Sequence, residues 1–343
     1  MQRRRLGSSL RDVAVIGLGG KGLTGARRGL SPDDVQRAVG AAIDAGCELI
    51  DVPAAGEPER RVGIELRALR ARDRVVVATA VGRPGRKPPL AAQVQRGVED
   101  ALRALRIDAL PLVQLAGWDD AWLDDRTWPE LRGTLARLIT EGKARAWGVI
   151  APDGTAPLRV IAEPWLATVQ IRYSLFDRAA EEAVLPAALA AKVGVIAREP
   201  LAAGGLAGDL GPGTPWLPGD ERAAWPASRW RDLPEALAGL AALVRSTPPA
   251  ATASEAGRAL LDGLVRADDL EQATVAELAL RFVVDHPAVT AAIAGARTAA
   301  HVIANLGCAE GRPLSARVRA ALDERRWGEG WYATGPVAAT IDR

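Results

Sequence analysis

The feature that most constrains the fold is an alternation of short apolar runs, often β-branched, with longer amphipathic stretches along this 343-residue chain. Such alternation is typical of repeated strand–helix units, in which parallel strands are covered by helices. Eight runs are predicted to be strands: residues 13–18, 48–51, 74–80, 110–116, 144–150, 167–171, 193–197 and 289–294. Eight strands favour an α/β fold of the closed (β/α)8 type, a TIM barrel, over an open doubly wound sheet.

The first predicted helix shows how the residues set these elements. Ser31 can cap a helix, Pro32 suits its first position, and Asp34 completes a capping box. Apolar residues then recur at helical spacing from Val35 to Ile43, and Gly46 ends the pattern.

Two additions are expected on a single barrel domain spanning residues 1–343, in which 325–343 form a C-terminal tail. Residues 4–17 are predicted to form an N-terminal β-hairpin that leads into the first strand. Residues 205–232 form a long loop after strand seven, rich in Gly, Pro and Trp. Active sites of such barrels lie at the carboxyl ends of the strands, so this loop is interpreted as a lid over a ligand, with a simple surface loop as the alternative.

Composition excludes several classes of function. The net charge of +2 argues against a nucleic-acid partner, and no run approaches the roughly 20 apolar residues of a membrane helix. Two cysteines and two histidines give no disulfide framework, no metal site and no Ser-His-Asp relay. We therefore expect a cytoplasmic protein that acts on a small molecule.

Several motifs, in order, resemble those of the aldo-keto reductase superfamily over nearly the whole chain. They are RRLG at 4–7 with GLG at 17–19, LID at 49–51 followed by Glu59 and Gly63, VQIRYSLFDR at 169–178, AREPLAAGGLAG at 197–208, and IAGART at 293–298 with Asn305.

The resemblance implies that NADP(H) lies across the carboxyl ends of the strands. Arg297 would hold the 2′-phosphate, Thr298 would open an anion-binding helix, and Asn305 would contact adenine. Gln170 would bind the nicotinamide carboxamide, and Arg198 would lie by the nicotinamide or pyrophosphate. The remaining implied cofactor contacts come from the loop after strand seven: Pro200, Leu201, Gly204 and Leu206.

Some cofactor contacts of the family are missing. Ile150 and Ala151 replace a Ser-Asn pair, and His301 and Ala304 replace acidic or amide residues. The affinity for NADP(H) is therefore expected to be reduced.

The residues of this chain also differ from the catalytic tetrad of the superfamily. Asp51 stands at the position of the aspartate, but Gly56 stands for the tyrosine, Ala80 for the lysine and Ala116 for the histidine. A positioned acid contributes about 10²–10⁴ in rate, so the family mechanism should be crippled. These small residues, with Trp118 on the loop after strand four, are predicted to line an enlarged substrate pocket.

Asp51 needs a partner or a proton once its lysine is lost. Lys21 and Lys87 lie in loops after strands, whereas Lys143 and Lys192 precede strands and fall on the opposite face. By the resemblance, Lys21 aligns near a substrate-pocket residue of the superfamily. Asp51 and Lys21 are therefore the predicted catalytic residues.

Three functions remain open from the sequence. The first is an NADP(H)-binding oxidoreductase with a rebuilt active site, acting on a carbonyl or imine-type substrate. The second is a catalytically inactive protein that binds NADP(H) or a metabolite. The third keeps the barrel but performs lyase or isomerase chemistry, with Asp51 or a loop glutamate as base.

Overall fold

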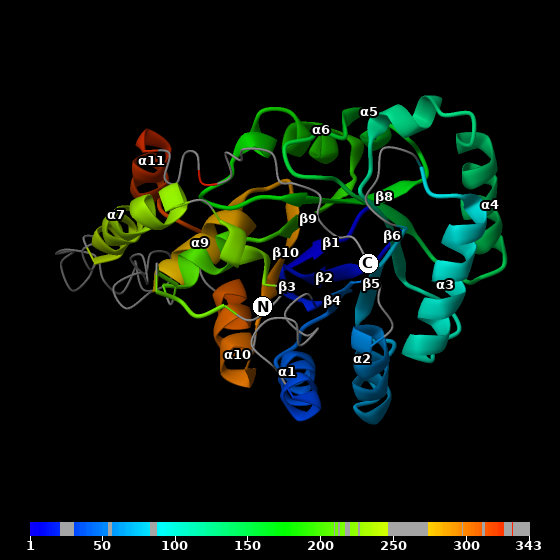
Figure 1. The fold of residues 1–343 in the computed structure, drawn as a ribbon, viewed down its shortest axis with the longest axis horizontal. Coiled ribbons are helices and arrows are strands. Elements are labelled where there is room, and N and C mark those ends of the chain that lie inside the picture. Colours follow the sequence, from blue (N-terminus) through cyan, green and yellow to red (C-terminus); the bar gives the residue numbers. More distant parts are fainter. Residues whose placement is uncertain are drawn as a thin grey trace, which may run out of the picture.

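The computed structural model describes residues 1–20, 31–53, 57–82, 88–208, 210–211, 213–216, 220–225, 227–245, 274–296, 298–310, 313–325 and 331. Eight parallel strands close into a barrel in the order β10-β3-β4-β5-β6-β7-β8-β9. Their bounds are β3 Ile16–Gly19, β4 Leu49–Val52, β5 Val76–Val81, β6 Leu112–Ala116, β7 Trp147–Ile150, β8 Leu166–Arg172, β9 Gly194–Arg198 and β10 Val289–Gly295. The predicted (β/α)8 barrel is confirmed, and a strand forms in each of the eight predicted regions (Figure 1).

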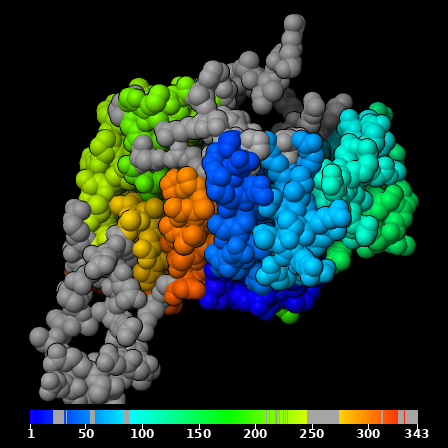
Figure 2. Space-filling view, turned by 90° about the horizontal axis from the view of Figure 1, so that it is seen from below, coloured from blue at the N-terminus to red at the C-terminus, as the bar shows by residue number. Residues whose placement is uncertain are grey.

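Helices surround the barrel (Figure 1). Those of the described residues are α1 Pro32–Asp44, α2 Glu57–Ala68, α3 Ala91–Leu105, α4 Trp128–Thr140, α5 Leu158–Ile161, α6 Val184–Ala191, α7 Ala227–Arg245, α9 Val275–Asp285, α10 Ala299–Gly307 and α11 Ala316–Glu324. Figure 2 shows α10 in orange beside α1 in blue and α2 in lighter blue, so the first and last barrel helices meet.

The N-terminal hairpin is present, although it is shorter than predicted. Strand β1 (Arg3–Arg5) pairs antiparallel with β2 (Asp12–Ala14), and the chain bends at Val15 before β3 begins. The predicted strand 13–18 is therefore two elements. Leu6, Leu10 and Val13 of the hairpin are buried together with Leu49 and other interior residues of the barrel. The hairpin thus closes the amino end of the barrel and leaves the carboxyl ends of the strands as the mouth.

The first helix forms as its sequence predicts. The side chain of Ser31 accepts a hydrogen bond from the amide of Asp34, and the Asp34 carboxylate accepts one from the amide of Ser31. The helix ends at Asp44, and Gly46 has a φ of +84°, which favours glycine.

The segment after β9 differs from the expected long loop. It contains short 3-10 turns at Ala202–Ala207 and Glu221–Ala224, and α7 already begins at Ala227. Trp225 packs on two other tryptophans: its ring centroid lies 5.4 Å from that of Trp230 and 5.3 Å from that of Trp331. These tryptophans therefore cover one another, and the tail residue Trp331 lies against the segment.

Candidate active site

The polar side chains of the barrel interior gather just below its mouth. Leu49 and Leu112 belong to the buried interior of the barrel, and residues two positions further along a strand share its face. Asp51 and Gln114 therefore project inward above these leucines. Gln170 of β8 reaches the same place from the opposite arc of the barrel, as its hydrogen bonds show.

Two amides hold the carboxyl group of Asp51. Gln170 Nε2 donates to Asp51 Oδ1 over 2.9 Å, and Gln114 Nε2 donates to the same oxygen over 3.1 Å. Gln170 Nε2 also lies 3.3 Å from Gln114 Oε1, so the two amides support each other. Both glutamines are buried, whereas Asp51 is partly exposed.

The environment of Asp51 favours its neutral form. Burial raises its pKa from 3.8 to about 6, and the two amide hydrogen bonds and the charge of Arg198 offset only part of that shift. Within the described part of the chain, no lysine or arginine forms an ion pair with Asp51. Asp51 is thus a carboxyl that titrates near neutral pH.

Small side chains occupy the two positions that the resemblance assigns to the lysine and histidine of the superfamily. Ala80 at the end of β5 is in register with Gln114, and Ala116 at the end of β6 is in register with Ile150. Ala80 and Ala116 are both partly exposed at the mouth. Lys21 and Gly56 lie outside the described residues, so the pairing of Lys21 with Asp51 stays a prediction.

Thr79 precedes Ala80 and faces the opposite way. Its hydroxyl donates to Glu59 Oε1 over 2.5 Å, and both side chains are buried between β5 and α2. Glu59 therefore joins the helix to the barrel wall and does not lie at the mouth.

A second polar cluster lies at the mouth on β8 and β9. Arg172 and Arg198 are in register at the ends of these strands, and the carboxylate of Asp153, on the loop after β7, bridges them. Arg198 Nη2 also donates to the carbonyl of Ala151 over 3.0 Å, and Arg172 Nε pairs with Asp177 at 2.6 Å. The sequence analysis gives a role to Arg198 alone among these residues, although Arg172 and Asp177 lie in the motif at 169–178.

Trp118 packs inside a cluster of aromatic rings, and this geometry does not support its predicted place in a substrate pocket. The centroid of its ring lies 5.2 Å from that of Trp122, 5.5 Å from Trp128 and 5.9 Å from Trp165. Its side chain is 1% exposed, and its Nε1 donates to Asp120. The position of Trp118 is therefore explained by packing among the other indole rings.

Tyr173 is also held away from the mouth. Its hydroxyl donates to Glu181 over 2.6 Å, and its ring packs on Phe282 of α9 and on His286. Burial and the charge of Glu181 raise the pKa of Tyr173. The phenol therefore acts as a structural donor.

The loop after β9 has an unusual backbone. Glu199, Ala202 and Ala203 have φ values of +55°, +50° and +54°, and Gly204 has +103°. Positive φ costs a non-glycine residue energy, and such strain clusters at functional sites. Pro200 and Leu206 are buried, whereas Leu201 and Gly204 are partly exposed.

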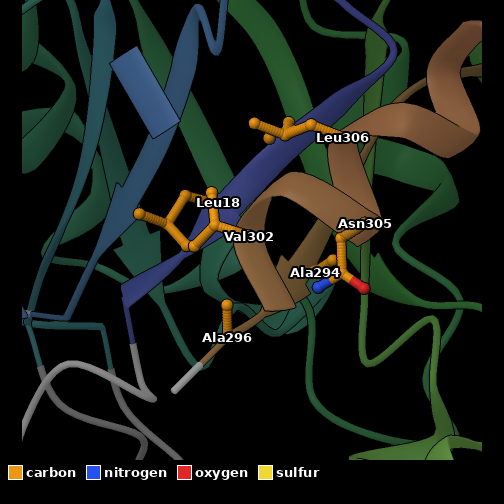
Figure 3. A pocket seen from close by; sticks show the side chains of 7 residues that line it. Leu18, Ala294, Ala296, Val302, Asn305 and Leu306 are labelled. Carbon is orange, nitrogen blue, oxygen red and sulfur yellow. The ribbon is translucent and has the colours of Figure 1, made fainter. Parts of the chain in front are cut away.

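A shallow hollow, partly open to solvent, lies between strands β3 and β10 and helix α10. Leu18, Ala294, Ala296, Val302 and Leu306 give it apolar walls, and the amide of Asn305 stands among them (Figure 3). Asn305 Nδ2 donates to the carbonyl of Gly295 over 3.3 Å. Thr298 caps α10 beside the hollow by accepting from the amide of His301, while Arg297 lies outside the described residues.

The described residues offer neither a metal centre nor a membrane span. No group of three or more His, Cys, Asp or Glu residues among them could hold a metal ion. No helix in the same part of the chain is both long and apolar enough to cross a membrane.

Comparison with known proteins agrees with this geometry. The model of the Aldo/keto reductase family matches residues 15–326. The chain belongs to this family. Among curated aldo-keto reductase relatives, YhdN of Bacillus subtilis is 30% identical over 210 residues, which cover 58% of this chain and 62% of YhdN. YrpG of the same species, an uncharacterized oxidoreductase, is 32% identical over 152 residues, covering 40% of this chain and 45% of YrpG. The matched regions span less than two thirds of either relative.

Solved aldo-keto reductases share the fold over nearly their whole length. A Klebsiella pneumoniae enzyme in complex with NADPH is 26% identical with a TM-score of 0.66, and the alignment covers 97% of this chain and 98% of that one. A Bacillus halodurans enzyme in its holo form is 24% identical with a TM-score of 0.68, covering 94% and 96% of the two chains.

Sequence reasoning gave no role to Gln114, Arg172 or Asp153. Gln114 offered one signal, because it is the polar residue of the otherwise apolar strand Leu112–Ala116. An arginine and an aspartate near strand ends have many ordinary explanations, and only the closed barrel shows that Asp153 reaches both arginines.

Proposed function

We propose that this aldo/keto reductase family member is an NADP(H)-dependent oxidoreductase in which Asp51 supplies the proton to a carbonyl or imine-type substrate. The observation that carries the proposal is the Asp51 carboxyl held by the amides of Gln114 and Gln170 below the barrel mouth. Ala80 and Ala116, both partly exposed at the mouth, are proposed to line the substrate site.

The residues present suit the adenosine end of NADP(H) best. The Asn305 amide beside the hollow is proposed to contact adenine, and the Thr298-capped start of α10 suits a phosphate. The bound NADPH of the Klebsiella pneumoniae structure supports the choice of cofactor. Arg297 and the loop residues Pro200, Leu201, Gly204 and Leu206 are proposed to hold the remaining phosphates.

The nicotinamide end is altered. Gln170 donates to Asp51 and Gln114, and Arg198 donates to Asp153 and the Ala151 carbonyl. The donor group of Gln170 is therefore already engaged and does not point to a carboxamide as the resemblance implies, and Arg198 would have to leave Asp153 to reach the nicotinamide or pyrophosphate.

NADPH supplies a hydride when bound. Asp51 donates its proton to the substrate oxygen or nitrogen as that atom takes up the electron pair of the double bond. The carboxylate that remains keeps both amide donors on Oδ1, and water at the mouth returns the proton. Because an amide N–H can donate to a carboxylate and to the carbonyl of a carboxylic acid, Gln114 and Gln170 satisfy Asp51 throughout the cycle.

The experiment follows NADPH oxidation with a panel of carbonyls and imines, for the wild type and for Asp51→Asn. The amide variant keeps Oδ1 as an acceptor for both glutamines but has no acidic proton. We expect the rate to fall by about 10²–10⁴ while NADPH binding, read by tryptophan quenching, is unchanged. Asp108→Asn, which changes an exposed carboxylate before β6, is the matched control and should keep wild-type turnover.

Two outcomes would contradict the proposal. Equal turnover by Asp51→Asn would show that another group delivers the proton. Saturable NADPH binding without oxidation of any substrate would instead favour the inactive binding protein, for which the engaged Gln170 and Arg198 are the structural argument.

A further inference from the structure

The arginine pair on β8 and β9 lacks a role in the proposed hydride and proton transfer. The side chain of Arg172 is 9% exposed and that of Arg198 is 17% exposed, while Asp153 between them is 51% exposed. Two nearly buried guanidinium groups at a barrel mouth are therefore bridged by a carboxylate that reaches in from solvent.

We propose that Arg172 and Arg198 bind a carboxylate of the substrate, and that Asp153 occupies this position until the substrate displaces it. The proposal rests on the proposed function for its site, and it assigns the substrate class: a small carbonyl or imine compound that carries a carboxylate.

The geometry of Asp153 supplies the template. Its Oδ2 pairs with Arg172 Nη1 and its Oδ1 with Arg198 Nη2, so one carboxylate spans both strands. A second carboxylate of the same shape can make the same two charge-assisted contacts. Because the exchange replaces one carboxylate by another, the charge in contact with the two guanidinium groups does not change.

Arg198 has hydrogen-bonding capacity that the described residues do not use. Its Nε is buried, and no described atom accepts from it. A buried donor without a partner costs free energy. The carboxylate of Glu199 does not fill this need, since its Oε1 lies 3.9 Å from Arg198 Nη1, beyond hydrogen-bonding distance. A ligand carboxylate could accept hydrogen bonds from both Nη2 and Nε of Arg198, whereas the carboxylate of Asp153 contacts only Nη2.

Asp153 is also the carboxylate that can leave most easily. Asp177, the other partner of Arg172, sits in a turn closed by backbone bonds with Ser174, and its side chain is 16% exposed. Asp153 lies between β7 and α5, next to Gly154, which has a φ of +73° and open space where a side chain would begin. Released Asp153 would return to water.

The pair lies next to the proposed proton donor. Arg198 interacts electrostatically with Asp51, and Gln170, which holds Asp51, lies two residues before Arg172 on β8. A carboxylate held by the arginines would therefore direct an adjacent C=O or C=N group towards Asp51. This geometry favours 2-oxo and 2-imino acids over neutral carbonyl compounds.

The test uses calorimetric titration of the full chain with oxalate, an unreactive carboxylate probe, at a constant ionic strength set with KCl. We expect saturable binding to the wild type and about tenfold tighter binding to Asp153→Asn, because the variant loses its internal competitor. Arg172→Met and Arg198→Met should weaken binding by on the order of tenfold to a hundredfold. Asp124→Asn is the matched control, since Asp124 is also an exposed carboxylate paired with an arginine, and its affinity for oxalate should equal that of the wild type.

Three results would overturn the assignment. The first is that neither the wild type nor Asp153→Asn binds oxalate saturably. The second is that these two proteins bind oxalate with equal affinity. The third is that NADPH displaces oxalate and that Arg172→Met also loses affinity for NADPH. The last result would give the arginines to the cofactor phosphates. Asp153→Asn changes only an exposed loop residue, so the decisive comparison does not depend on a core variant that fails to fold.

Failure of the proposed function gives a different result. Oxalate binding needs neither NADPH nor turnover. If the predicted oxalate affinities are found but no carboxylate substrate is reduced, the carboxylate site stands and the oxidoreductase proposal falls. If neutral carbonyls are reduced as fast as 2-oxo acids and oxalate does not bind, the oxidoreductase proposal stands and the carboxylate site falls.

Discussion

Replacing Asp51 by Asn should change how the stability of this protein depends on pH. The pKa of Asp51 is raised from 3.8 to about 6 in the folded protein, so the folded state holds a proton that the unfolded state releases between these values. This contribution to stability is complete below pH 3.8 and is lost as the pH rises through 6. Asparagine does not titrate, and its Oδ1 can still accept from Gln114 and Gln170.

The size of the effect follows from proton linkage. At pH 5 about nine tenths of the folded molecules carry the Asp51 proton, whereas the unfolded chain is almost fully ionised. Integrating this difference from pH 8 down to pH 5 gives about 1.4 kcal/mol. The free energy of unfolding of Asp51→Asn, relative to the wild type, should therefore rise by up to about 1.4 kcal/mol from pH 5 to pH 8.

Urea denaturation at pH 5, 6, 7 and 8, followed by tryptophan fluorescence, measures this difference. Other titrating groups cancel because both proteins contain them. Asp108→Asn removes an exposed carboxylate and should give a nearly constant difference. A constant or falling difference for Asp51→Asn would refute the reasoning, because it would show that the folded protein holds Asp51 ionised.

Three further predictions address the site and the scaffold. Ala80→Lys would place an ammonium beside the Asp51 carboxyl and its two amides, since residue 80 is in register with Gln114. The ammonium should lower the Asp51 pKa. NADPH turnover, which is expected to fall above pH 6 in the wild type, should then fall at a lower pH, as a pH–rate profile would show. Gly63→Ala should destabilise the protein by about 1–3 kcal/mol, because the added Cβ would clash with the Leu105 carbonyl oxygen. Gly40→Ala should instead stabilise α1 by up to about 1 kcal/mol, because nothing lies within 4 Å of the added Cβ. Urea denaturation measures both changes. Thr298→Ala removes the cap of α10 and should cost about 1 kcal/mol of stability and weaken NADPH binding in a fluorescence titration, whereas Thr298→Ser should preserve both.

The barrel could be predicted because its strands and helices carry local signals. Ser31, Pro32 and Asp34 mark the start of α1 within four residues, and the runs that became β5, β6 and β10 are apolar over their whole length except for Thr79, Gln114 and Thr290. Element ends were less certain. Val13 and Ala14 continue the apolar run of β3, and only pairing with the N-terminal strand assigns them to the hairpin.

The site could be predicted only in part, because its contacts join distant residues. Asp51 and Gln170 were each identified from a motif, but their mutual hydrogen bond links positions 119 residues apart. The resemblance assigned Gln170 to a cofactor, and it could not show that the amide is already engaged. Trp118 was expected at the pocket because it follows β6, yet the neighbouring indoles that bury it come from three later segments of the chain.

The changes around Asp51 have a common physical consequence. A lysine at position 80 would stabilise the ionised carboxyl and hold the Asp51 pKa low, so that the aspartate could only orient its partner. Alanine at 80 and 116 removes both potential cations, and burial then raises the pKa towards neutrality. The amides of Gln114 and Gln170 favour the ionised carboxylate, but they offset only part of this rise. We therefore propose that the side chains around Asp51 give it the means to deliver a proton itself.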